Sequence, residues 1–139
     1  MKPLLLSLCT AIWVSGCGGA EPSSSTGGAQ TDSASLTGSA SVTIAWDSPT
    51  TTVNQNCTTD LSGYTVYAGR SMGVYALNFR VPSNAASCTA TGLSNSCGQV
   101  LSCSYTISGL ANGAWHFAVT AYDGGGSESA YSDDLSHTL

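Results

Sequence analysis

The chain has 139 residues, of which 8% are charged, and its formal net charge is −5. An average soluble chain carries roughly 25% charged residues, so uncharged polar residues replace charges here. If Lys2 lies in a removable leader, two arginines remain against eight acidic residues, a net charge of −6. Such a surface is a poor electrostatic match for phosphates, which excludes nucleic acid as the main partner.

The first seventeen residues, MKPLLLSLCTAIWVSGC, have the organisation of an export signal. Lys2 supplies a positive start, and the apolar run that follows covers residues 4–14. A helix that crosses a bilayer needs roughly 20 apolar residues, so this run is too short for a membrane span. Its length and the small residues after it predict a secretory signal peptide.

The end of this segment, Val14-Ser15-Gly16-Cys17, resembles the lipobox of bacterial lipoproteins. The resemblance implies that residues 1–16 are cleaved off as a lipoprotein signal peptide and that Cys17 is acylated on its thiol and its new amino group. Several acyl chains hold a protein stably, at about 0.8 kcal/mol per buried methylene. The next residue is glycine rather than the aspartate that retains lipoproteins in the inner membrane, which favours the outer membrane of the cell envelope. The alternative is an ordinary secretory signal with a coincidental cysteine.

Residues 17–40, which begin with the lipidated cysteine, are predicted to form a tether. Glycine, serine, alanine and threonine dominate this segment, and its one large apolar residue is Leu36. Such a composition cannot bury enough apolar surface to offset the entropy lost on ordering. We therefore expect a flexible linker between membrane and domain. A first strand hidden in residues 36–40 would shorten it.

From Ser41 onwards, apolar and polar residues alternate in short runs, a period typical of half-buried strands. The alternating runs are residues 42–46, 64–68, 75–81, 105–107 and 115–121, with a last strand expected around Leu135. No window of helical length has a 3.6-residue period. We therefore predict an all-β domain over residues 41–139 with six or seven short strands, which favours a β-sandwich.

Three stretches of this domain, VTIAW, GYTVYAG and SGLANGAWHFAVTAYDGGGSESAYSD, resemble a fibronectin type III domain. The resemblance covers about residues 40–139 and implies an immunoglobulin-like β-sandwich. Trp115 stands where the family usually has the tyrosine of the tyrosine corner, so the hydroxyl of that corner is missing here. The family's Arg-Gly-Asp motif is absent, and no adhesive role is carried over from it.

Four cysteines follow Cys17, and an even number in an exported chain predicts disulfides. In the sandwich topology we favour the pairs Cys97–Cys103 and Cys57–Cys88, because the first closes a short loop and the second joins the longer ones. The competing pairing is Cys57–Cys103 with Cys88–Cys97.

No metal or cofactor is expected. The four cysteines include no Cys-x-x-Cys pair, and exported thiols oxidise, which argues against zinc. Asp123 and Glu128 carry oxygen ligands that suit calcium, but their spacing does not fit an EF-hand loop.

No set of residues predicts catalysis. Alternation directs His116 away from the core into solvent, and His137 lies near the chain end, where we expect fraying. The neighbouring Asp133 and Asp134 should face opposite sides of a strand. No Gly-x-Ser-x-Gly elbow is present, so we expect a protein that is not an enzyme.

The sequence therefore predicts a non-catalytic interaction or display module, attached to a membrane by its lipid and contacting an unidentified protein or glycan. The candidate contact residues are Tyr67, Met72, Tyr122 and Tyr131, because tyrosine is enriched at binding surfaces. Two alternatives are a carbohydrate-binding accessory domain, which needs aromatic rings exposed on one flat face, and a spacer or assembly subunit of an envelope complex.

Overall fold

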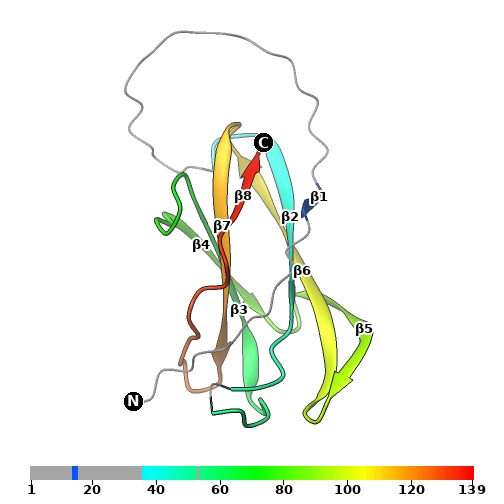
Figure 1. The fold of residues 1–139 in the computed structure, drawn as a ribbon. Helices are drawn as coiled ribbons and strands as arrows, with labels where there is room; N and C mark the ends of the chain where they lie inside the picture. Colours follow the sequence, from blue (N-terminus) through cyan, green and yellow to red (C-terminus); the bar gives the residue numbers. More distant parts are fainter. Residues whose placement is uncertain (1–13, 16–35, 53) are drawn as a thin grey trace, which may run out of the picture.

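The computed structural model describes residues 14–15, 36–52 and 54–139. These residues form two four-stranded antiparallel sheets that make a β-sandwich (Figure 1). The first sheet has the order β1 (Val14–Ser15), β2 (Ala40–Asp47), β6 (Gly98–Leu110) and β5 (Ser87–Asn95). The second has the order β4 (Leu77–Pro82), β3 (Leu61–Gly69), β7 (Ala114–Asp123) and β8 (Leu135–Thr138). In this part of the chain no helix is long and apolar enough to cross a membrane.

The predicted acylation site, Cys17, and most of the predicted signal peptide and tether lie outside the described residues. Two residues of the predicted signal peptide form β1, in which Val14 pairs with Ile44 of β2. The sandwich begins close to the expected boundary, because β2 starts at Ala40.

Alternation along β2, β3 and β7 builds the core, as the sequence predicts. Side chains at every second position of a strand share one face. The inward-facing side chains of β2, β3 and β7 lie between the two sheets. There the rings of Trp46 and Tyr64 meet edge to face, with centroids 5.0 Å apart. The inward residues of the three strands are all at most 2% exposed: Val42, Ile44, Trp46, Tyr64, Val66, Ala68, Trp115, Phe117, Val119 and Ala121.

The strand β5 was not predicted, and β6 is longer than its alternating run. Every residue of β5 except Cys88 is exposed. A strand without a buried face lacks the hydrophobic period on which the prediction depends. Its pairing with β6 forms a hairpin whose outer part stands off to one side of the sandwich in Figure 1.

The cysteines pair as Cys57–Cys97 and Cys88–Cys103, so the favoured pairing and the competing one are both wrong. The reason lies in the hairpin. Cys88 and Cys103 stand directly opposite each other on β5 and β6. Cys97 lies in the turn that joins these strands, six positions before Cys103, which corresponds to roughly 20 Å of extended chain. It therefore reaches Cys57 in the loop between β2 and β3 instead.

The corner between β6 and β7 is built around the indole of Trp115. The Nε1–H of Trp115 donates a hydrogen bond to the carbonyl oxygen of Ala111, at 2.8 Å. The guanidinium of Arg70 lies 3.9 Å from the centre of the indole ring and donates to the carbonyl oxygen of Ala114, at 2.9 Å. Trp115 therefore fills the core and also fixes the chain that turns into β7.

The end of the chain is held in the sheet rather than frayed, which corrects the prediction for His137. This residue lies in β8 opposite Trp115. Beyond it, Leu139 and Gly113 exchange two backbone hydrogen bonds, at 2.9 and 3.0 Å. The last strand therefore closes the edge of β7 next to the corner.

Candidate functional site

The segment between β7 and β8 follows the edge of β7 and brings polar side chains to the outer face of the second sheet. Its backbone amides at Ser129 and Ser132 donate to the carbonyls of Ala121 and Val119, at 2.9 and 2.8 Å. The hydroxyls of the same two serines accept hydrogen bonds from the amides of Ala121 and Val119, at 2.9 Å each. The two serine side chains thus satisfy backbone amides of β7 in the stretch that β8 does not cover.

Three tyrosines gather on this outer face, and we call this cluster the tyrosine face: Tyr67, Tyr75 and Tyr131. The ring of Tyr131 lies 4.9 Å from that of Tyr67 and 5.2 Å from that of Tyr75, between centroids. Tyr67 and Tyr75 are 6.0 Å apart. Tyr131 is the most open of the three, with 54% of its surface exposed.

A carboxylate, Glu128, supports one side of the tyrosine face. It accepts hydrogen bonds from the hydroxyls of Tyr67, at 2.8 Å, and of Thr120. Burial raises the pKa of Tyr67 to about 12, and the hydrogen bond to Glu128 adds to this effect. Burial alone would raise the pKa of Glu128, but hydrogen bonds, led by those from Thr120 and Tyr67, and the charge of Arg80 together hold that pKa below its usual value.

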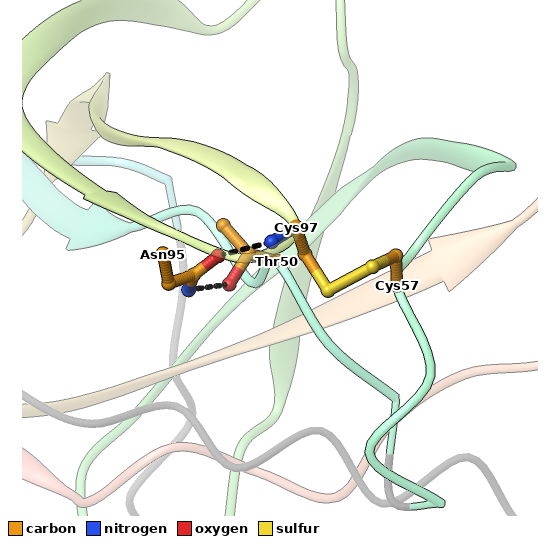
Figure 2. Close-up of a disulfide and its surroundings, with 4 residues drawn as sticks. All are labelled: Thr50, Cys57, Asn95 and Cys97. Carbon is orange, nitrogen blue, oxygen red and sulfur yellow. Dashed lines mark hydrogen bonds between the residues drawn. A yellow bond between two sulfur atoms is a disulfide. The ribbon is translucent and has the colours of Figure 1, made fainter.

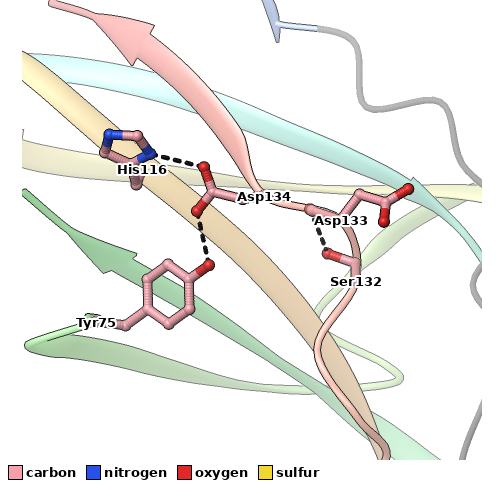
Figure 3. A network of polar contacts seen from close by, with 5 residues as sticks. All are labelled: Tyr75, His116, Ser132, Asp133 and Asp134. Carbon is pink, nitrogen blue, oxygen red and sulfur yellow. Dashed lines mark hydrogen bonds and ion pairs between the residues drawn. The ribbon is translucent and has the colours of Figure 1, made fainter. Parts of the chain in front are cut away.

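A second carboxylate, Asp134, joins the other side of the tyrosine face to His116 (Figure 3). Its Oδ1 accepts from the hydroxyl of Tyr75 at 2.7 Å, and its Oδ2 lies 2.6 Å from Nδ1 of His116. Burial raises the pKa of Tyr75 to about 12, with a further contribution from the hydrogen bond to Asp134. Because Nδ1 faces the carboxylate, the opposite ring nitrogen, Nε2, points away from it.

The predicted direction of the His116 side chain is confirmed, but the prediction that it is freely solvated is wrong. Its side chain points away from the core, but it is 20% exposed and paired with Asp134 instead of freely solvated. The carboxylates of Asp133 and Asp134 point apart in Figure 3, but both residues precede β8, so they do not lie in a strand as predicted.

Of the four predicted contact residues, the structure brings two together. Tyr67 and Tyr131 lie side by side, whereas Met72 is 70% exposed in the turn between β3 and β4. Tyr122 is only 7% exposed, because the guanidinium of Arg80 covers its ring at 3.7 Å. Its prediction as a surface residue is therefore wrong.

Sequence reasoning missed Tyr75, which it placed in one alternating run with Leu77. The turn after β3 ends in a bridge between Ser71 and Val74, and β4 begins only at Leu77. The period of two therefore does not extend back to Tyr75, whose ring reaches the tyrosine face. No glycine or proline lies between Tyr75 and Leu77, so the sequence carries no signal for this break.

The described residues bring together no group of three side chains that could hold a metal ion. Asp123 and Glu128, weighed as calcium ligands, turn in different directions. Asp123 accepts a hydrogen bond from the amide of Ser127 at 2.8 Å, within its own turn, while Glu128 faces Tyr67.

In comparisons over the whole chain, no protein-family model and no curated protein matches it. The functional argument therefore depends on the geometry of the site. The tyrosine face offers aromatic surface and hydroxyls on a sheet, with both supporting carboxylates already hydrogen-bonded. Such a surface is suited to binding.

Proposed function

We propose that the protein is a lipid-anchored, extracytoplasmic module of the bacterial cell envelope that binds a protein partner through its tyrosine face. Two disulfides support the location, because disulfides persist in oxidising compartments outside the cytoplasm. The lipobox at residues 14–17 supports the anchor. The single observation that carries the binding role is the cluster of three tyrosines around the exposed ring of Tyr131.

The anchor is tested by the substitution Cys17→Ser. We expect the wild-type protein in the membrane fraction with the mass of an acylated amino terminus, because acyl chains supply the attachment. We expect the variant in the soluble fraction and without lipid mass. Fractionation followed by intact mass spectrometry measures both. Wild-type protein that carries no lipid, or a variant that stays in the membrane, would contradict the anchor.

The chemistry of the tyrosine face favours a protein partner over a sugar. Tyrosine supplies a large, rigid contact surface with a polar tip, which suits protein interfaces. A sugar-binding platform needs rings exposed in one plane. Here the planes of the three rings are inclined to one another by 48°, 90° and 62°, so they present edges and faces rather than a flat floor.

The binding role is tested by crosslinking in intact cells and purification of the anchored protein. We expect Tyr131→Ala to reduce recovery of the crosslinked partner by at least about tenfold, the effect of losing one central aromatic contact. Leu93→Ala is the matched control, because Leu93 is 67% exposed on β5 of the other sheet. Equal recovery with both variants would contradict the tyrosine face, and absence of any partner from the wild type would favour a spacer.

A further inference from the structure

The disulfide Cys57–Cys97 lies at the outer end of the β5–β6 hairpin (Figure 2). Cys97 follows Ser96 in the turn between the two strands. From residue 89 to residue 99, every side chain other than that of Cys97 is exposed. The hairpin tip therefore gains little from burial, and the disulfide is its covalent link to the rest of the domain.

The partner cysteine, Cys57, lies in the loop between β2 and β3. Backbone hydrogen bonds within this loop hold its shape. The amide of Thr52 donates to the carbonyl of Asn56 at 2.8 Å, and that of Thr58 donates to Thr50 at 2.9 Å. Cys57 is exposed in this loop. Beside the disulfide, a hydrogen bond from Nδ2 of Asn95 to Oγ1 of Thr50, at 2.6 Å, joins hairpin and loop (Figure 2).

The second disulfide provides the contrast within the same molecule. Cys103 is completely buried, and its sulfur lies 3.7 Å from the hydroxyl of Tyr64 in the core. Its partner Cys88 packs against the same core. Thiol–disulfide exchange needs access of a thiolate to a sulfur atom, and this access is blocked at Cys103.

We propose that Cys57–Cys97 is a thiol-modification site, at which an external thiol opens the bond while Cys88–Cys103 stays closed. The thiolate of the external thiol attacks the sulfur of Cys57, a residue that is exposed in its loop. A mixed disulfide forms there, and Cys97 leaves as a thiolate that takes up a proton. A second external thiol then attacks the external sulfur of the mixed disulfide and releases the thiol of Cys57. In total, one protein disulfide and two external thiols become two protein thiols and one external disulfide.

Opening this bond changes the hairpin tip and leaves its base in place. At the base, the amide of Ser48 donates to the carbonyl of Leu101 at 2.7 Å, and Cys88–Cys103 still joins β5 to β6. The tip is then held to the loop by side-chain hydrogen bonding, which water competes for at an exposed site. This inference does not depend on the lipid at Cys17, and it holds for either outcome of the anchoring test.

The test uses the exported full-length protein, purified in detergent with its free thiols blocked. The protein is exposed to reduced glutathione for increasing times, acid-quenched and alkylated, and the cysteine peptides are quantified by mass spectrometry. We expect Cys57 and Cys97 to become alkylated at least about tenfold faster than Cys88 and Cys103, in line with their access to thiolate. We also expect the glutathione adduct on Cys57 and an unchanged far-ultraviolet circular dichroism spectrum.

Equal rates at the two bonds, or faster opening of Cys88–Cys103, would overturn the proposal. The single variant Cys97→Ser gives an independent reading, because it leaves Cys57 as a free thiol with the buried disulfide intact. We expect Cys57 in this variant to react with glutathione disulfide in the folded protein. Failure to react until denaturant is added would show that Cys57 is not accessible and would also refute the site.

Discussion

Replacing Trp115 with alanine is expected to lower the free energy of unfolding by about 3–5 kcal/mol, the range for truncating a large buried aromatic residue. Trp115 is completely buried between the sheets. Its loss removes the indole that donates to Ala111 and the ring on which Arg70 lies. The change therefore leaves a cavity and also frees the corner that leads into β7. Urea unfolding with both disulfides intact measures the effect.

Trp115→Phe separates the two contributions, because it keeps an aromatic ring and removes the N–H. We expect it to cost about 1–3 kcal/mol, from a lost hydrogen bond and a smaller loss of volume. The contrary result is a free energy of unfolding for the alanine variant that lies within about 1 kcal/mol of the wild-type value, an effect expected for a surface substitution. In that case the corner does not hold the sandwich together.

Removal of the buried disulfide is the second large effect. The double variant Cys88→Ala/Cys103→Ala is expected to lose about 2–5 kcal/mol of stability, because the bond restricts the unfolded chain and its sulfurs fill space at the core. The two cysteines are 15 residues apart in sequence, and the chain-entropy model gives roughly 3 kcal/mol for a loop of that length. Urea unfolding of the folded variant measures the loss.

A matched control lies one position along the same ladder, where Ser87 stands opposite Ser104 without a covalent bond. Both serines are on the same strands as the cysteines. The variant Ser87→Ala/Ser104→Ala should cost no more than about 1 kcal/mol, the typical value for one exposed hydrogen bond. Similar losses for the two double variants would mean that the disulfide stabilises no more than its neighbours do.

Strands with one face buried in the core could be predicted from the sequence. A strand without a buried face could not be predicted in this way. Val42, Ile44 and Trp46 repeat every second residue because one face of β2 is buried. The strand β5 has no such face, so its sequence carries no period. The disulfide pairing depended on knowing that β5 exists, since only its pairing with β6 places Cys88 opposite Cys103.

For the candidate site, the sequence predicted which way some side chains point but not the contacts between distant residues. Alternation correctly put Tyr67 and His116 on the outer face. It had no means to show that Arg80, from another strand, would cover Tyr122, or that Asp134 would meet both His116 and Tyr75. These contacts join residues that are 18 to 59 positions apart, and the local pattern of a strand contains no information about them.

The serine hydroxyls along β7 also bear on how neighbouring copies of the domain would behave at high concentration. An exposed sheet edge with unpaired amides is a template for pairing with another chain and for aggregation. The strand β8 covers only Leu135–Thr138 and pairs with one end of β7. Further along, Ser129 and Ser132 occupy the amides of Ala121 and Val119 with side-chain oxygens, which cannot continue a ladder. These two amides of β7 are thereby closed to a second molecule, so copies of the domain can be concentrated without joining their sheets at these positions.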